Sequence, residues 1–261
     1  MSQANPQSIG PQPWFRVQPD PRARIRLFCF PYAGGGSAIF RHWSSEFLYP
    51  IELVPALLPA REARIREPGY TRLDKLVEKL ALEIAPYLDK PFAFFGHSMG
   101  ALIGFELARR LRDERGLEPE HLFVSGRRSP RIPRRDLYIH DLPEAEFVEE
   151  IERMNGTPRE VLEHKELMAL LIPMLRADFA VCHSYDYAPG EPLRCPITVL
   201  GGTSDEEAPR EELEAWCKET TGQCRLQMLE GDHFFINQRQ PVANNNIPRL
   251  ITLALQLANP R

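Results

Sequence analysis

The feature that most constrains this chain is a serine between two glycines, in Gly96-His97-Ser98-Met99-Gly100. An apolar run at 92–95 precedes it, and a helical pattern of apolar residues begins at Ala101. This order predicts a buried strand, a sharp turn and a helix, with the serine hydroxyl exposed in a strained backbone conformation. A side chain at position 96 or 100 would collide with the neighbouring strand or helix. We therefore interpret Ser98 as a nucleophile.

A serine hydroxyl becomes a good nucleophile only when a histidine takes its proton and a carboxylate orients that histidine. In chains with this kind of turn the three residues follow in the order Ser, Asp, His. Asp205 follows a predicted strand at 195–200, and His233 follows a predicted last strand at 224–229. Both lie at the carboxyl ends of strands, which is the edge where Ser98 also lies. The sequence thus predicts a triad of Ser98, Asp205 and His233.

Other acids and histidines are weaker candidates. Asp232 and Asp186 are the rivals of Asp205, but Asp232 is adjacent to His233 and cannot easily reach its far nitrogen. His97 lies within the turn, where its side chain should pack near the strand ends. The remaining histidines stand in helical or loop contexts and are interpreted as surface or packing residues. They are His42, His121, His140, His164 and His183.

Acyl transfer also needs donors for the oxyanion of the tetrahedral intermediate. The strand predicted at 24–30 leads into Pro31-Tyr32-Ala33-Gly34-Gly35-Gly36, which we call the glycine loop. The backbone amides of Met99 and Ala33 are the predicted donors. A phosphate cradle is the alternative for three successive glycines, but neither Gly-Lys-Ser/Thr nor Gly-x-Gly-x-x-Gly is present.

Strand-like runs alternate with helical patterns along most of the chain, which predicts an α/β fold with a mostly parallel sheet. These runs lie at 24–30, 51–54, 91–95, 121–125, 195–200 and 224–229. Consecutive helices replace the alternation between 127 and 190. We call this stretch the lid segment and expect it to arch over Ser98, although ordinary helices packed on the sheet are the alternative. Its stretch 167–175 is apolar on more than one side and is expected to break at Pro173.

Composition sets further bounds. A length of 261 residues suits one α/β domain, predicted at 21–261, after a polar, proline-rich arm at 1–20 that should be disordered. The net charge of −4 gives no reason to expect nucleic acid. Five irregularly spaced cysteines argue against a disulfide framework and against a zinc site, so no metal is expected. Cys217 and Cys224 can approach one another, but we expect a reduced pair in the cytosol. Without a signal peptide or a long apolar run, we expect a cytoplasmic protein with no membrane segment.

Six ordered motifs, spread over about residues 24–258, resemble those of type II thioesterases, the stand-alone editing enzymes of polyketide and nonribosomal peptide synthesis. They are Phe30-Pro31-Tyr32-Ala33-Gly34-Gly35, Phe40-Arg41-x-Trp43, Leu58-Pro59-Ala60-Arg61-Glu62, Gly96-His97-Ser98-Met99-Gly100, Gly201-Gly202-x-x-Asp205 and Gly231-Asp232-His233-Phe234-Phe235. The chain departs from the family at Ala60, where the usual motif is Pro-Gly-Arg-Glu.

This resemblance implies an α/β-hydrolase fold and a triad at Ser98, Asp205 and His233. It implies hydrolysis of acyl thioesters from the phosphopantetheine arm of acyl or peptidyl carrier proteins, without metal or organic cofactor. We expect a monomer. The alternatives are a medium-chain fatty acyl thioesterase, a small-ester carboxylesterase and, more remotely, a non-catalytic docking module that keeps the fold.

Two further groups of residues are assigned by hypothesis. The apolar lid residues Leu167, Leu171 and Leu175 should line the acyl pocket or its cover. A run of arginines follows the strand at 121–125, and we expect it to dock an acidic carrier protein and its phosphate. The docking residues are Arg131, Arg134 and Arg135. A solvated linker into the lid segment is the alternative for this run.

Overall fold

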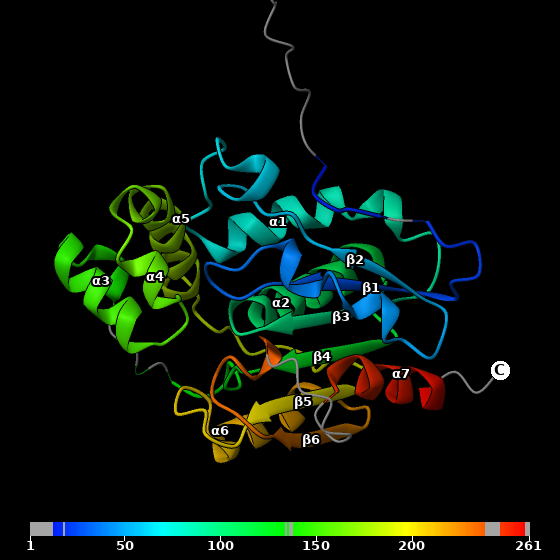
Figure 1. The fold of residues 1–261 in the computed structure, drawn as a ribbon. Coiled ribbons are helices and arrows are strands. Elements are labelled where there is room, and N and C mark those ends of the chain that lie inside the picture. The colour runs from blue at the N-terminus through cyan, green and yellow to red at the C-terminus, as the bar shows by residue number, and fades with distance from the viewer. Residues whose placement is uncertain (1–12, 18, 134, 136–137, 238–245, 259–261) are drawn as a thin grey trace, which may run out of the picture.

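The computed structural model describes residues 13–17, 19–133, 135, 138–237 and 246–258. They form a six-stranded sheet in the order β2-β1-β3-β4-β5-β6, and every neighbouring pair is parallel (Figure 1). The strands are β1 (Ile25–Phe30), β2 (Ile51–Pro55), β3 (Phe92–His97), β4 (His121–Ser125), β5 (Ile197–Gly202) and β6 (Cys224–Leu229). The predicted parallel α/β sheet is therefore confirmed.

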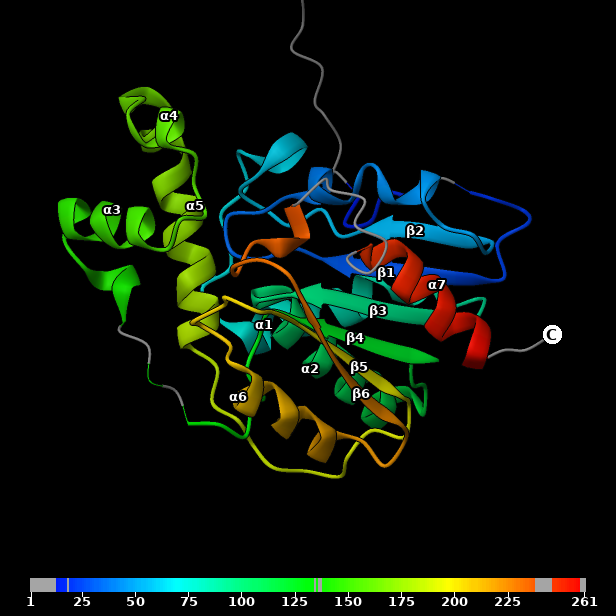
Figure 2. The same cartoon turned by 60° about the horizontal axis from the view of Figure 1, so that its bottom comes forward.

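Helices cover both faces of the sheet (Figures 1 and 2). Helices α1 (Leu73–Glu83), α2 (Met99–Arg115) and α6 (Arg210–Glu214) share one hydrophobic core with the strands. Helix α7 (Ile247–Ala258) belongs to a second core on the opposite face. The sheet is thus the middle layer of three, which is the arrangement that a parallel sheet needs to bury its side chains.

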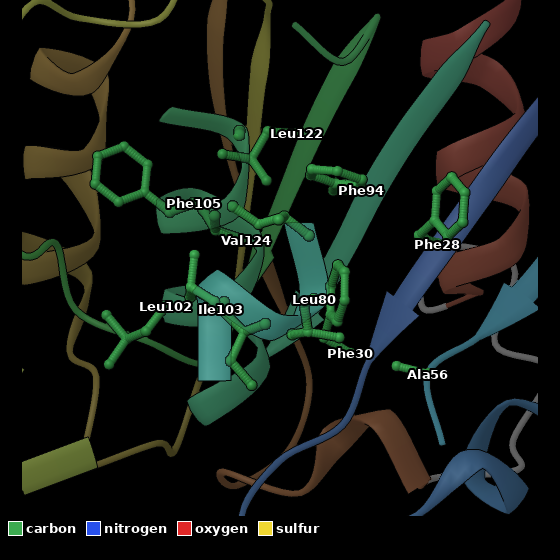
Figure 3. Close-up of a cluster of buried hydrophobic side chains, with 14 of the residues drawn as sticks. Phe28, Phe30, Ala56, Leu80, Phe94, Leu102, Ile103, Phe105, Leu122 and Val124 are labelled. Carbon is green, nitrogen blue, oxygen red and sulfur yellow. The ribbon is translucent and has the colours of Figure 1, made fainter. Parts of the chain in front are cut away.

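Strand β1 shows how the two cores divide the side chains. Phe28 and Phe30 pack in the first core, where Figure 3 shows them near Phe94. Leu27 and Cys29 point to the opposite face and pack in the second core. All six residues of β1 are buried, as expected for a strand covered on both faces.

Two aromatic residues of the predicted disordered arm are buried in the structure. Trp14 and Phe15 are buried in the first core, and Phe15 forms an antiparallel bridge with Ala56 beyond the end of β2. The guanidinium of Arg64 lies 4.1 Å from the centre of the Trp14 ring. The prediction of a disordered arm at 1–20 is therefore wrong for these two aromatic residues, because they bury a large apolar area. Residues 1–12 lie outside the described residues.

The lid segment between β4 and β5 contains α3 (Glu144–Arg153), α4 (Arg159–Leu162) and α5 (Lys165–His183). These helices build a small hydrophobic core of their own and stand beside the sheet (Figures 1 and 2). The expected break at Pro173 is wrong, since α5 continues through it. Pro173 and Ala169 are both exposed, so water can reach the carbonyl that loses its amide partner.

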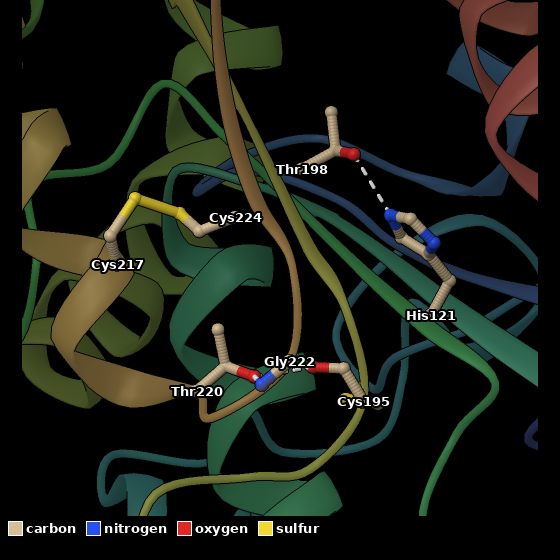
Figure 4. Close-up of a disulfide and its surroundings, with 7 residues drawn as sticks. All are labelled: His121, Cys195, Thr198, Cys217, Thr220, Gly222 and Cys224. Atoms are coloured by element: carbon tan, nitrogen blue, oxygen red, sulfur yellow. Dashed lines mark hydrogen bonds between the residues drawn. A yellow bond between two sulfur atoms is a disulfide. The ribbon is translucent and has the colours of Figure 1, made fainter.

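Two of the five cysteines form a disulfide, which corrects the expectation of a reduced pair. Cys217 lies in a short turn before β6, and Cys224 begins that strand, so their Cα atoms are 5.3 Å apart (Figure 4). This separation lies within the range that a disulfide spans. Cys29, Cys182 and Cys195 are free and buried. In the described part of the chain, no helix combines the length and apolarity needed to cross a membrane.

Candidate active site

The turn between β3 and α2 has the strained geometry that the sequence predicts. Ser98 has φ 53° and ψ −113°, a backbone conformation that residues other than glycine rarely adopt. A Cβ atom on Gly96 would lie 2.0 Å from the carbonyl oxygen of Gly100, and one on Gly100 would lie 2.0 Å from that of Phe30. Both glycines are therefore required for the turn to pass between its neighbours. The predicted steric reason for the two glycines is confirmed.

Asp205 and His233 are brought together at the carboxyl edge of the sheet. The Nδ1 atom of His233 lies 2.9 Å from Oδ2 of Asp205, whose side chain is fully buried. The other oxygen, Oδ1, accepts the amides of Glu207 and Ala208 at 2.9 and 3.2 Å. Burial favours the neutral acid, but the His233 contact and the two amides outweigh burial and lower the pKa of Asp205. The carboxylate is thus ionised and accepts the Nδ1 proton, which leaves Nε2 of His233 as the basic atom.

The rival acids Asp232 and Asp186 are placed differently. Asp232 turns its carboxylate back to its own loop, where Oδ1 accepts the amide of Phe234 at 2.9 Å. Asp186 lines a separate cavity beside residues 127–133. Of the three acids considered, Asp205 is the one that contacts Nδ1 of His233.

His97 supports the loop that carries His233. Its Nε2 lies 2.9 Å from the carbonyl oxygen of His233, so Nε2 must carry the proton, and Nδ1 accepts the Ser125 hydroxyl at 2.9 Å. Burial, with the nearby His233 adding to it, lowers the pKa of His97 to about 3. His97 is thus a neutral, buried brace, in line with its predicted packing role.

The predicted oxyanion donors come from two segments, the start of α2 and the glycine loop after β1. Met99 is the first residue of α2, where the backbone amide has no partner within the helix. Ala33 follows β1 in the glycine loop and lines the same cavity as Ser98 and His233. Parallel strands bring both amides to this edge.

Two adjoining cavities meet at the glycine loop. The first, the Ser98 cavity, has a volume of about 360 Å³ and is lined by Ser98 and His233 together with lid residues such as His183. The second, the apolar cavity, has a volume of about 210 Å³, and its lining residues carry no charge. Both are lined by Tyr32, Ala33, Met154, Phe179 and Phe234. The lid segment thus forms part of the wall of both cavities.

The three predicted lid leucines divide between the apolar cavity and other positions. Leu171 and Leu175 line the apolar cavity, whereas Leu167 lines neither cavity. Phe179 and His183 line the Ser98 cavity from α5, although the sequence predicts no role for Phe179 and only a surface or packing role for His183. Their signal was weak, because each is one residue in a long helical pattern.

The predicted docking arginines are engaged within the chain. Arg131 pairs with Glu219 at 2.6 Å, and Arg135 pairs with Glu212 at 2.7 Å. Arg135 also lines the Ser98 cavity. Arg134 lies outside the described residues. These ion pairs reduce the positive charge that the run presents to a partner.

The sequence of the chain decides its family. A model of the thioesterase domain matches residues 25–249. The chain belongs to the thioesterase family. Members of this family hydrolyse thioesters, so this thioesterase is a hydrolase. The matched region includes Ser98, Asp205 and His233.

Relatives of this thioesterase come from antibiotic biosynthesis and from fatty acid synthesis. It is 48% identical to the gramicidin S biosynthesis protein GrsT of Aneurinibacillus migulanus, over 85% of this chain and 88% of GrsT. The structure of BorB, a type II thioesterase from the borrelidin biosynthetic cluster, is 32% identical, with a TM-score of 0.82 over 93% of this chain and 97% of BorB. The medium-chain thioesterase of the rat fatty acid synthase is 30% identical, over 92% and 91% of the two chains. The resemblance to type II thioesterases is thus confirmed.

Proposed function

We propose that this thioesterase edits biosynthetic synthases by hydrolysing acyl groups from the phosphopantetheine arms of their carrier proteins. The contact between Asp205 and Nδ1 of His233, beside the strained Ser98, carries the proposal. The greater identity to GrsT than to the rat fatty acid synthase enzyme favours a synthase of the antibiotic type over release of medium-chain fatty acids.

The proposed reaction has two halves. Nε2 of His233 takes the proton of Ser98 as its oxygen attacks the thioester carbonyl, and the amides of Met99 and Ala33 bind the oxyanion. The C–S bond then breaks, and the thiolate of the arm leaves with the proton from His233. Water repeats the sequence on the acyl-serine and releases the carboxylic acid. Asp205 stabilises the imidazolium of His233 in both halves.

The two cavities suggest where the parts of the substrate lie. The apolar cavity opens beside Ala33 and has no charged lining, which suits the acyl chain. Its volume of about 210 Å³ favours short or branched acyl groups over long ones. The wall of the Ser98 cavity carries charges of both signs and suits the polar pantetheine arm. Its charged residues are Arg127, Arg128, Arg135, Glu150, Glu206 and Glu207. We propose Leu171 and Leu175 as residues that set the acyl length.

The partners in this proposal are acyl and peptidyl carrier proteins, and the enzyme acts as a cytoplasmic monomer. Light scattering coupled to size-exclusion chromatography tests the oligomeric state. In this proposal Arg131 and Arg135 contact the carrier protein, and their ion pairs with Glu219 and Glu212 limit the charge that they present to it.

Intact-protein mass spectrometry of loaded carrier proteins tests the function. Carrier proteins that bear acetyl, branched and long-chain acyl groups are incubated with the enzyme and with Ser98→Ala. The proposal predicts that the wild type restores the free thiol of carriers with short and branched groups, and that Ser98→Ala does not. Preferred turnover of medium-chain acyl groups would instead indicate a fatty acyl thioesterase. Faster turnover of simple oxygen esters would indicate a carboxylesterase. A fluorophosphonate label that fails to react with Ser98 would indicate a docking module.

A further inference from the structure

A buried ion pair lies directly behind the glycine loop. Arg61 follows β2, and Asp178 lies in α5 of the lid segment, 117 positions further along the chain. The two side chains are 6% and 5% exposed, and Nη2 of Arg61 lies 2.6 Å from Oδ1 of Asp178. Burying two charges costs more than an ordinary surface pair unless further hydrogen bonds satisfy them. What else these groups bind is therefore informative.

Both partners bind the backbone of the glycine loop. Oδ2 of Asp178 accepts the amide of Gly34 at 2.7 Å and Nη1 of Arg61 at 2.9 Å. The same Nη1 donates to the carbonyl of Gly35 at 2.7 Å, and Nε of Arg61 donates to the carbonyl of Pro59 at 3.1 Å. The pair thus holds the loop at one donor and one acceptor.

The held atoms are next to the proposed oxyanion donor. Gly34 follows Ala33, whose amide we propose as a donor, and the Gly34 backbone has φ 82°. The amide of Gly35 closes a turn onto the carbonyl of Tyr32 at 2.9 Å. Fixing the Gly34 amide and the Gly35 carbonyl therefore fixes the rotation of the turn that carries the Ala33 amide. An oxyanion donor is effective only when its direction is set before the charge forms.

The loop also packs on the same helix. A Cβ atom on Gly34 would lie 2.6 Å from Cδ2 of Leu175, one turn before Asp178 in α5. Glu62, next to Arg61, accepts the Ser37 hydroxyl at 2.6 Å and so holds the chain just beyond the loop. The loop is thus clamped between α5 and the segment after β2.

We infer that Arg61 and Asp178 are positioning residues that hold the Ala33 amide in place for the oxyanion and make that arrangement depend on the seating of α5. The inference rests on the proposed function, because it assumes that Ala33 is an oxyanion donor. It explains why a charged residue interrupts the apolar face of a lid helix.

The test removes the pair without leaving an unpaired buried charge. The double variant Arg61→Met/Asp178→Leu replaces both charged side chains by apolar ones of similar volume. Such a replacement of a buried ion pair often leaves the free energy of unfolding unchanged or raises it. The matched control is Arg26→Met/Glu52→Leu. It removes a buried ion pair near the amino ends of β1 and β2, away from the carboxyl edge where the glycine loop lies. Both are assayed with a small acyl thioester that lacks the carrier protein, and with an alkyl boronic acid that forms a tetrahedral adduct on serine.

The first double variant should lose kcat by about 10- to 100-fold, somewhat less than the loss of a whole oxyanion donor. Its affinity for the boronic acid should fall by a similar factor, while KM changes less than about threefold. The control should keep kcat and boronic acid affinity at the wild-type level, whatever its melting temperature. A purely structural role for Arg61 and Asp178 would instead lower the melting temperature of their double variant and leave its kcat and boronic acid affinity unchanged.

Two outcomes would overturn the inference: wild-type kcat in a folded Arg61→Met/Asp178→Leu, or a loss of kcat with unchanged boronic acid affinity. If this double fails to fold, Arg61→Lys decides by the same readouts. Lysine keeps the charge, but its single nitrogen cannot hold Asp178, Gly35 and Pro59 together. Failure of the proposed function would be distinct, because the wild type would then fail to restore the free thiol of carrier proteins loaded with short or branched acyl groups, whatever the variants do with the small thioester and the boronic acid.

Discussion

His97 should make the stability of the fold depend on pH. Its pKa is lowered from 6.5 to about 3, chiefly by burial, so the folded protein keeps the ring neutral while the unfolded chain protonates it. Below pH 6.5 the unfolded state binds more protons, and the free energy of unfolding falls as the pH falls. The stability is therefore full above pH 6.5 and is lost progressively down to about pH 3.

The size of the loss follows from these two values. Each pH unit between them is worth about 1.4 kcal/mol when one site differs fully in protonation. At pH 7.5 the unfolded chain is almost neutral at this site, and at pH 5.5 it is about nine-tenths protonated. His97 should therefore lower the free energy of unfolding by about 1.4 kcal/mol between these pH values.

Urea denaturation of the wild type and of His97→Gln at pH 7.5 and 5.5 measures this effect. Glutamine can donate to the His233 carbonyl and accept from Ser125, but it does not titrate. The variant should be less sensitive to this pH change by about 1.4 kcal/mol, whatever its absolute stability. His42→Gln, at an exposed position, is the control and should keep the wild-type pH dependence. An equal pH dependence in His97→Gln and the wild type would refute the assignment of His97 as a buried neutral brace.

Four further substitutions have expected outcomes. Ser98→Ala should abolish turnover of a carrier-bound acyl thioester. Asp205→Asn should lower kcat by up to about four orders of magnitude while the circular dichroism spectrum stays native, because His233 then takes the wrong tautomer. Near-normal kcat in Asp205→Asn would transfer the acid role to another carboxylate. Ala60→Gly should raise the free energy of unfolding, measured in urea, by about 0.5–1 kcal/mol. Ala60 has φ 66°, and a left-handed alanine costs roughly 1–2 kcal/mol, but the greater freedom of glycine in the unfolded chain offsets part of the gain. An unchanged or lower free energy of unfolding would contradict this strain. Leu171→Trp should fill the apolar cavity and shift the kcat/KM preference toward shorter acyl groups; a fall in melting temperature with unchanged preference would make Leu171 a core residue.

The sequence predicts that the three proposed triad residues share one edge of the sheet, because parallel strands impose this placement. Ser98, Asp205 and His233 each follow a strand, and strands that run in one direction bring their carboxyl ends together. A local pattern and the order of the strands are then enough to place the three residues at one edge of the sheet. The requirement for Gly96 and Gly100 is also local, since the turn itself sets it.

The features that the sequence did not predict depend on contacts between distant segments. Arg61 and Asp178 are 117 positions apart, and nothing near either residue indicates the other. Trp14 lies in a polar, proline-rich stretch, and its burial depends on a pocket beside Arg64 that forms only in the folded chain. Arginine side chains in a run after β4 similarly find acidic partners such as Glu219. Composition shows the charge but not its neutralisation.

Backbone strain in the described chain gathers around the site. The described non-glycine residues with positive φ are Ala60, Glu62, Ser98 and Asn155. The first two flank Arg61, Ser98 is the proposed nucleophile, and Asn155 precedes Gly156 in the wall of the apolar cavity. Such a conformation costs on the order of 1–2 kcal/mol for residues other than glycine and asparagine, and it persists only where the surrounding structure holds it. Here the sheet holds Ser98, and the ion pair with the bonds of Glu62 holds the glycine loop, so the rigid layers of the fold maintain a site that local preferences alone would relax.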